Sequence, residues 1–156
     1  VIMKILIMGL PGSGKSTFAE TISKALFATR ISANQVREKY DDWDFSTEGR
    51  IRQSHRMKHL SDGVVMAGRV AIADFICPTE ETRREFDADF TIWMSTIDVG
   101  KYEDTNNIFT KPKDYDIKIS KWIGANQIYE CLDGFNPRIT NIESYSRELM
   151  KRLTKL

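Results

Sequence analysis

The sequence predicts an α/β fold, a three-layer α/β/α sandwich around a five-stranded parallel sheet. Short apolar runs of strand length alternate along the chain with longer stretches in which apolar residues recur at helical spacing. This alternation favours parallel neighbouring strands, with helices on both faces of the sheet. With 156 residues and no linker or repeat, the chain suits one compact domain, assigned to residues 1–156.

Each predicted strand is a short apolar run bounded by turn formers or polar residues. The first covers residues 2–8 and is stopped by Gly9, which is typical of a buried central strand. The other runs are at residues 28–32, 69–75, 90–94 and 117–119.

The predicted helices follow these strands. In the first, which begins near Lys15, Phe18 and Ile22 lie on one stripe. In the third, Ser46 is placed to cap the first turn, and the helix is expected to stop near Gly68. The helices are predicted at residues 15–26, 33–39, 46–68, 79–86 and 142–153.

A glycine-rich loop joins the first strand to the first helix. It reads Gly9-Leu10-Pro11-Gly12-Ser13-Gly14-Lys15-Ser16 and is followed by Thr17. Glycines let successive backbone N–H groups turn toward phosphate oxygens, and the start of the helix points its dipole at the same place. The motif, lying between a strand and a helix, predicts a P-loop NTPase fold of the nucleoside-kinase-like type.

The same loop predicts that the chain binds ATP and Mg²⁺. Lys15 is expected to reach the β and γ phosphates and the Ser16 hydroxyl to ligate magnesium, while Thr17 lies near the α phosphate. The expected nucleotide-binding residues are Gly9, Pro11, Gly12, Ser13, Gly14, Lys15, Ser16 and Thr17. The short chain favours a small kinase over the larger motor and signalling NTPases.

The composition excludes several other classes of protein. Cys77 and Cys131 lie far apart without a metal-ligand spacing, which disfavours a disulfide framework or a zinc site and fits the cytoplasm. The 23 basic and 22 acidic side chains lack the basic excess of a protein that grips nucleic acid. Neither a signal-peptide core nor a membrane-spanning apolar run is present, so we expect a soluble protein without a membrane partner.

Three further motifs stand at or after the ends of the second and third strands, where acceptors bind in small P-loop kinases. They are Ser32-Ala33-Asn34-Gln35-Val36-Arg37, Asp44-Phe45-Ser46-Thr47-Glu48-Gly49-Arg50 and Phe75-Ile76-Cys77-Pro78-Thr79-Glu80-Glu81-Thr82-Arg83. With the glycine loop, they resemble adenylylsulfate kinases, which phosphorylate the 3′-hydroxyl of adenosine 5′-phosphosulfate. That family reads Asp-Gly-Asp-Asn-Val-Arg, Gly-Phe-Ser-x-Glu-Asp-Arg and Phe-Ile-Ser-Pro-Tyr-x-x-Asp-Arg. The resemblance covers roughly residues 4–119.

The resemblance implies an ATP-dependent phosphotransferase with an alcohol acceptor, adenylylsulfate or another small anion, and it leaves a homodimer open. The acceptor-binding residues that it implies are Arg37, Arg50, Gln53, Phe75, Ile76, Cys77 and Pro78. The two arginines would bind the phosphosulfate and Phe75 would stack on or flank the adenine. Arginine presents a planar fork of donors that suits such an anion.

The chain departs from the family at its acidic residues. Ser32 and Asn34 stand where the family has aspartates, so the carboxylate usually placed near the attacking hydroxyl is missing. Asp74 instead ends the third strand, where the family usually has a small residue. We interpret Asp74 as a replacement magnesium anchor or base, catalytic together with Lys15 and metal-binding together with Ser16. A loop-bracing aspartate is the alternative.

Residues 95–112 are expected to form a lid-like segment that is shorter than the family lid. Its cations Lys101, Lys111 and Lys113 are interpreted first as parts of a solvated loop, and contact of Lys101 or Lys111 with the transferring phosphate is the alternative. Two other functions also stay open. One is a kinase for another hydroxyl, on a nucleoside, a sugar or a polynucleotide 5′-end, and the other is a nucleotide-binding protein without kinase activity.

Overall fold

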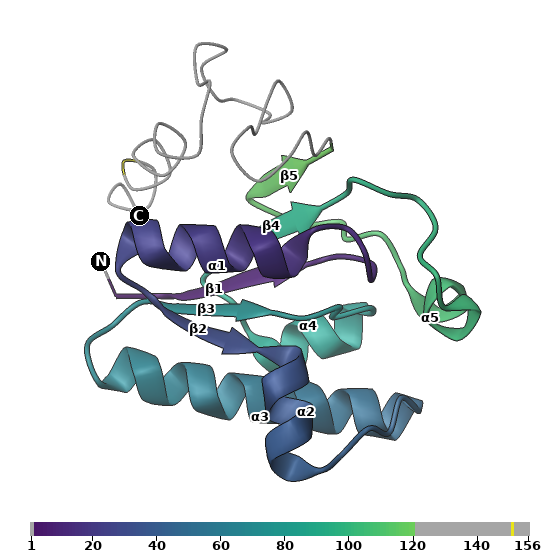
Figure 1. The fold of residues 1–156 in the computed structure, drawn as a ribbon, viewed down its shortest axis with the longest axis horizontal. Helices are drawn as coiled ribbons and strands as arrows, with labels where there is room; N and C mark the ends of the chain where they lie inside the picture. Colours follow the sequence, from purple (N-terminus) through teal and green to yellow (C-terminus); the bar gives the residue numbers. More distant parts are fainter. Residues whose placement is uncertain (1, 121–150, 152–156) are drawn as a thin grey trace.

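The computed structural model of the chain describes residues 2–120 and residue 151. Figure 1 shows the arrangement of its elements. In chain order they are β1 (Lys4–Met8), α1 (Lys15–Leu26), β2 (Thr29–Ser32), α2 (Ala33–Tyr40), α3 (Thr47–Met66), β3 (Ala71–Asp74), α4 (Glu80–Phe86), β4 (Phe90–Met94), α5 (Glu103–Ile108) and β5 (Ile117–Ile119). The helix predicted at residues 142–153 lies outside the described residues, apart from Lys151.

The strands form one sheet in the order β2-β3-β1-β4-β5, and every neighbouring pair is parallel. Strand β1 lies at the centre, and all five of its residues are buried. Helix α1 covers one face of the sheet, whereas α3 and α4 lie on the other (Figure 1). The predicted three-layer sandwich around a five-stranded parallel sheet is therefore confirmed.

Two hydrophobic clusters hold the layers together, one on each face of β1. Ile5 and Ile7 belong to the cluster beneath α1, which also contains Phe18. Leu6 and Met8 point the other way and join the cluster that includes residues of α3 and α4. This division follows from the two-residue period of a strand. Because full burial of one such side chain contributes about 1.5–3 kcal/mol, the two clusters dominate the stability of the fold.

The helix ends follow their capping chemistry. The Ser46 hydroxyl accepts a hydrogen bond from the Gly49 N–H at 3.2 Å, which confirms the predicted cap. Thr79 and Thr82 cap each other through backbone and side chain, so α4 begins one residue later than its predicted start. Helix α5 was not predicted, because six mostly polar residues show no apolar stripe. None of the helices in the described part of the chain has the length and apolarity needed to cross a membrane.

The strand register brings the functional motifs to one edge of the sheet. Asp74, the last residue of β3, is the register partner of Ile7 on one side and of Ser32 on the other. The glycine-rich loop after β1 and the start of α2 therefore flank the same carboxylate. Parallel strands place their carboxyl ends together, and ligands bind in the crevice outside them.

Gly49, in the first turn of α3, allows the preceding loop to approach the helix closely. The α2–α3 loop (residues 41–46) runs past this turn, and a Cβ at Gly49 would lie 2.2 Å from the Asp44 carbonyl oxygen. Real side chains do not tolerate such a distance, and the obstacle is backbone, so the loop itself would have to move. Gly49 therefore fixes the path of the loop.

Substitution tests this constraint. Gly49→Ala should destabilise the protein by about 1–3 kcal/mol, because the added methyl displaces the loop. Gly63→Ala in the same helix is the matched control, since nothing lies within 4 Å of its Cβ position. It should stabilise by about 0.5–1 kcal/mol through helix propensity. Urea denaturation measures both, and equal stabilisation by the two alanines would show that the loop does not constrain Gly49.

Candidate active site

The glycine-rich loop has the geometry of a phosphate cradle. Gly14 caps α1 with φ 94°, a left-handed conformation that favours glycine. Gly9 cannot carry a side chain, because a Cβ there would lie 2.6 Å from the Met94 carbonyl oxygen. The Ser13 hydroxyl is buried and has no hydrogen-bond partner within the described part of the chain. These observations fit a loop shaped to receive an anionic ligand.

Lys15 projects back into this loop. Its Nζ donates a hydrogen bond to the Leu10 carbonyl at 2.9 Å. Burial lowers the pKa of the Lys15 ammonium from 10.5 to about 8, and the negative charge of Asp74 opposes that shift. A partly desolvated ammonium held by a single carbonyl is well placed to exchange that partner for phosphate oxygens.

A cavity of about 680 Å³ opens beside the loop, over the carboxyl ends of the strands. Most of the predicted site residues line it. They are Pro11, Gly12, Lys15, Ser16, Arg37, Arg50, Gln53, Asp74, Phe75, Ile76 and Cys77. Five others do not: Gly9, Ser13, Gly14, Thr17 and Pro78. The first three shape the loop, Thr17 is exposed at the start of α1, and Pro78 is buried behind the wall.

Asp74 is held by an arginine that the sequence did not single out. Arg30 of β2 donates from Nε to Oδ1 at 2.8 Å and from Nη2 to Oδ2 at 2.9 Å. The Ser16 hydroxyl lies 3.4 Å from Oδ2. Burial raises the pKa of the Asp74 carboxyl, and the bonds from Arg30 oppose this rise. Asp74 therefore lies beside Ser16 and is held in place by Arg30, and its role stays a prediction.

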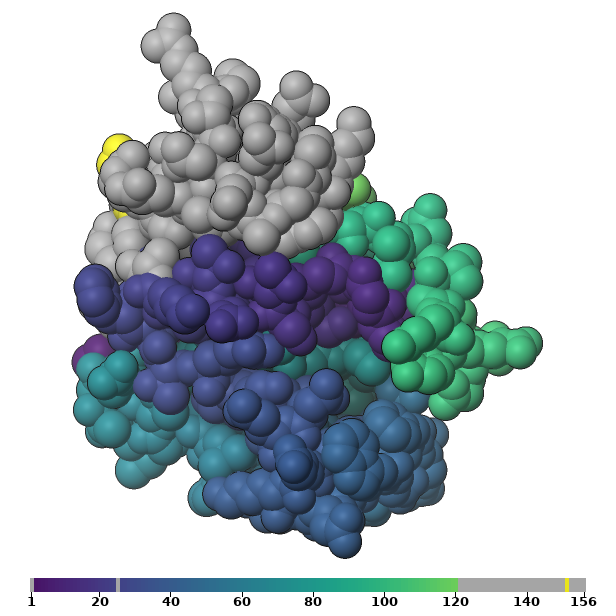
Figure 2. Space-filling view, viewed as in Figure 1, coloured from purple at the N-terminus to yellow at the C-terminus, as the bar shows by residue number. Residues whose placement is uncertain are grey.

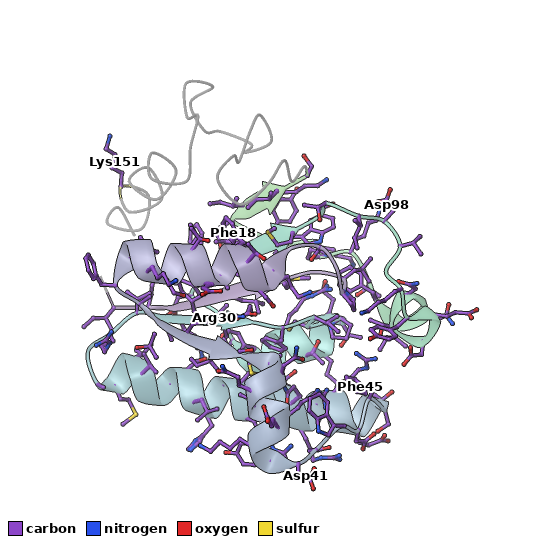
Figure 3. All side chains as sticks on the ribbon, in the orientation of Figure 1. Phe18, Arg30, Asp41, Phe45, Asp98 and Lys151 are labelled. Atoms are coloured by element: carbon purple, nitrogen blue, oxygen red, sulfur yellow. The ribbon has the colours of Figure 1, made fainter. Side chains whose placement is uncertain are left out.

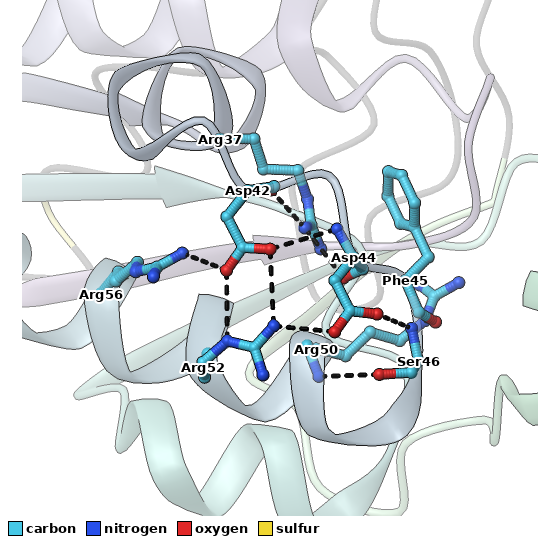
Figure 4. A network of polar contacts seen from close by, with 9 residues as sticks. Arg37, Asp42, Asp44, Phe45, Ser46, Arg50, Arg52 and Arg56 are labelled. Carbon is cyan, nitrogen blue, oxygen red and sulfur yellow. Dashed lines mark hydrogen bonds and ion pairs between the residues drawn. The ribbon is translucent and has the colours of Figure 1, made fainter.

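Phe45 lies close to both predicted acceptor arginines. The Arg37 guanidinium lies over the Phe45 ring, 4.2 Å from its centroid, and the Arg50 guanidinium lies 5.4 Å from the same centroid. Both arginines are buried. Arg37 also donates to the carbonyls of Asp42 and Asp44, and Arg50 to the Phe45 carbonyl (Figure 4). Both arginines line the cavity. A planar aromatic face and two cations therefore share one wall.

Ion pairs on the outer side of the α2–α3 loop hold this wall in place. Arg52 bridges the carboxylates of Asp42 and Asp44, and Arg56 reaches Asp42 from the next turn of α3 (Figure 4). Hydrogen bonds from Arg52 and from the loop backbone lower the pKa of Asp42. Single exposed pairs contribute little, but several charges that share partners restrict a loop more effectively.

The cavity offers two kinds of aromatic surface, a buried ring at Phe75 and exposed rings at Trp43 and Phe45. Phe75 is buried and packs edge-to-face on Phe86, with ring centroids 5.3 Å apart, so it can flank a ligand but has no free face. Phe45 and Trp43 are 43% and 51% exposed and line the cavity. The sequence offered one signal for them, which was two aromatic residues alternating with aspartates directly before a helix cap.

The turn after β3 is stiff and chemically inert. Cys77 has a left-handed backbone with φ 47°, a conformation that costs of order 1 kcal/mol outside glycine. Burial raises the pKa of its thiol to about 12, so Cys77 forms the wall and supplies no thiolate. Arg83 ties the turn to the end of the lid-like segment, donating to the Cys77, Pro78 and Thr110 carbonyls.

The lid-like segment packs against both sides of the cavity. The Thr96 hydroxyl donates to the Ser13 carbonyl at 2.7 Å, next to the phosphate loop. On the other side, Arg50 Nη2 donates to the Thr105 hydroxyl at 3.0 Å and lies 3.6 Å from the Asp104 carboxylate. Figure 2 shows this segment (green) beside the loop end of α1 (purple). Lys101 lines the main cavity, whereas Lys111 lines a separate small pocket.

The residues present fit a magnesium nucleotide. No group of three or more His, Cys, Asp or Glu side chains able to hold a metal occurs in the described residues. A divalent ion here would depend on the Ser16 hydroxyl, the phosphate oxygens and Asp74, which suits Mg²⁺, since it keeps several waters and takes few protein ligands.

Comparisons with known proteins identify relatives over most of the chain. A family model described as adenylylsulphate kinase matches residues 2–139. An adenylyl-sulfate kinase of Staphylococcus haemolyticus is 30% identical over an alignment that covers 92% of this chain and 77% of the relative. One from Shewanella pealeana is 31% identical over 78% of this chain and 65% of its own length. The chain thus spans less than two thirds of the second relative.

Solved structures agree on the fold. The APS kinase CysC of Mycobacterium tuberculosis, in complex with AMPPNP and APS, has a TM-score of 0.72 at 17% identity, with 97% of this chain and 96% of that chain covered. Shikimate kinase of Acinetobacter baumannii, in complex with shikimate, has a TM-score of 0.56 at 14% identity and 99% and 94% coverage. At these identities the likeness shows the fold alone.

The pKa of Lys15 predicts proton uptake on nucleotide binding. With a pKa of about 8, Lys15 of the free protein becomes largely neutral only at about pH 9, and the phosphates of Mg·ATP favour its charged form. Binding should therefore take up nearly one proton at about pH 9 and almost none at about pH 7, with affinity falling up to about tenfold per pH unit as pH rises above 8. Titration calorimetry in buffers of different ionisation enthalpy measures the uptake.

The control for this experiment is Lys101→Met, which removes another cation of the same cavity and should leave the uptake unchanged. Uptake that disappears in Lys101→Met, or none at about pH 9 in the unaltered protein, would contradict the assignment to Lys15.

Proposed function

The chain belongs to the adenylylsulphate kinase family, and from this we propose that it transfers the terminal phosphoryl group of ATP to the 3′-hydroxyl of adenosine 5′-phosphosulfate. The relatives are phosphotransferases with an alcohol acceptor. The observation that carries the proposal is that the phosphate loop and the Arg37–Phe45–Arg50 wall line one cavity. Donor and acceptor can therefore meet inside it.

The acceptor wall suits a nucleotide that carries a sulfated phosphate. Two cations provide donors for a diffuse anion, and the half-exposed Phe45 ring supplies an apolar face for a base. Within residues 2–120, Arg37 hydrogen-bonds through Nη1 alone, and Arg50 through Nε and Nη2. Each guanidinium therefore keeps donors for a ligand. The Oε1 of Gln53 has no hydrogen-bond partner among the described residues, so it can accept a hydrogen bond from a ligand.

The proposed reaction is an in-line displacement at phosphorus. The acceptor hydroxyl oxygen forms the new bond to the γ phosphorus while the bond to the β–γ bridging oxygen breaks, ADP leaves, and the hydroxyl proton passes to water or to Asp74. Lys15 offsets negative charge on the β and γ oxygens, and positioning by the two walls provides most of the remaining acceleration. Mg²⁺, held by Ser16 and through water by Asp74, would supply further charge neutralisation. Asp74 alternatively orients the attacking hydroxyl.

Several aspects of the function remain predictions. The cytoplasmic location, the homodimer and the use of Mg²⁺ rest on the sequence and on the family. The lack of aspartates at Ser32 and Asn34 keeps the alternative acceptors relevant. These alternatives concern only the acceptor side, because the phosphate loop is common to all of them.

An assay of acceptors tests the proposal directly. ADP formation is followed by a coupled assay with Mg·ATP and, in parallel, adenylylsulfate, nucleosides, sugars and 5′-hydroxyl oligonucleotides. We expect stimulation above background only with adenylylsulfate. Stimulation by another acceptor would replace the substrate, and ATP binding without stimulation by any of them would favour a nucleotide-binding protein.

Arg37 and Arg50 should act on the acceptor and not on ATP. Replacing either by alanine removes a charged hydrogen bond of about 1.5–3 kcal/mol and should lower kcat/KM for the acceptor by about ten- to a hundredfold. The KM for ATP should stay within about twofold. Arg84→Ala, an exposed arginine of α4, is the control. If the arginine variants weaken ATP binding and spare the acceptor, the assignment of this wall is wrong.

Asp74→Asn removes the charge beside Ser16 and retains the size of the side chain. Because both proposed roles of Asp74 need a negative charge, kcat should fall at least about a hundredfold with only a modest change in melting temperature. Asp62→Asn is the matched control, since Asp62 also pairs with a buried cation, Lys4, but lies on α3 away from the cavity. It should retain kcat. Full activity of Asp74→Asn would show that Asp74 is neither a magnesium anchor nor a base, and that its role is structural.

A further inference from the structure

We propose that Arg30 is a positioning residue of the phosphoryl-transfer site, which orients the Asp74 carboxylate toward Ser16. The inference rests on the proposed function in that Asp74 is taken to serve the reacting phosphate. Arg30 does not line the cavity, so it acts through Asp74 and not by touching a substrate.

The contact geometry fixes the plane of the carboxylate. Two parallel bonds, 2.8 Å from Nε and 2.9 Å from Nη2, engage both oxygens of Asp74. Such a bidentate pair restricts rotation of the carboxylate about the Cβ–Cγ bond of Asp74. A single hydrogen bond from a lysine would not restrict it. Asp74 is 3% exposed and Arg30 is 24% exposed, so water competes weakly for the pair. The remaining Oδ2 lone pair faces Ser16.

The sheet explains why an arginine on β2 can do this. Ser32 is the register partner of Asp74, and Arg30 stands two residues earlier on the same face of β2. From there its guanidinium reaches the Asp74 carboxylate on the neighbouring strand. Figure 3 shows Arg30 between β2 and helix α1, on the side of the sheet from which α1 carries Ser16.

The pair also has an electrostatic consequence. An unpaired carboxylate beside the phosphate loop would repel a triphosphate, whereas the Arg30–Asp74 pair is close to neutral. Among the charged groups of the described residues, Lys15 and Arg30 act on Asp74, and Glu20 of α1 acts on Arg30. Arg30 is therefore the partner that lets a carboxylate occupy this position without weakening nucleotide binding.

The test compares Arg30→Lys, which keeps the charge and loses the fork, with Asp74→Asn and with the double variant. The readouts are kcat, the affinity for ATP and the affinity of the ADP complex for Mn²⁺ by electron paramagnetic resonance. Arg30→Lys should lower kcat and Mn²⁺ affinity by about tenfold, as is typical of residues that hydrogen-bond to a metal ligand and orient it. The affinity for ATP should stay within about twofold. In the Asp74→Asn background, Arg30→Lys should cause no further loss of kcat.

Lys24→Met, which removes an exposed cation of α1 paired with Glu20, is the control and should change none of these values. If the effects of Arg30→Lys and Asp74→Asn multiply, or if Arg30→Lys retains both kcat and Mn²⁺ affinity, Arg30 does not act through Asp74. Should the unaltered protein phosphorylate no acceptor, the proposed function fails, but the Mn²⁺ measurement still decides the role of Arg30.

Discussion

The parallel register of β2, β3 and β1 is the constraint on which the site depends. It places Ser32, Asp74 and Ile7 side by side at the point where three chain segments leave the sheet. The register is itself enforced by burial, because a slip of one residue would turn every apolar side chain of β1 from one cluster to the other. The positions of the phosphate loop and of the carboxylate are thus fixed by the same packing that stabilises the domain.

The acceptor wall is built differently, from charge and close backbone contact. Arg37 and Arg50 hold the α2–α3 loop through its carbonyls and also line the cavity, so each arginine has a structural and a ligand-facing side. The similar family motif carries glycine and aspartate at the positions of Asp44 and Gly49, in the reverse order. In this chain the Asp44 backbone occupies the space that a side chain at Gly49 would need. The two positions are therefore sterically dependent on each other in this chain.

Sequence reasoning worked best where structure is local. The glycine loop and the cap at Ser46 are chemical patterns within a few residues, and the run at 90–94 coincides with β4. Strand order is not local, so the partner of Asp74 could not be found. Arg30 became significant only because β2 lies beside β3. Nor could the sequence show which face of Phe75 is covered, because that depends on packing against Phe86. The roles of these residues in catalysis remain predictions.

Arg50 is bound at the same time by the lid-like segment, through Thr105 and Asp104, and by the loop that carries Phe45. An anionic acceptor that bound Arg50 through Nη2 would compete with Asp104. Such coupling is reciprocal. If the contact of α5 with Arg50 weakens acceptor binding, acceptor binding weakens that contact by the same free energy. Arrival of the acceptor and docking of α5 are therefore antagonistic at this one group. Such an acceptor would therefore weaken the contact between α5 and the acceptor wall.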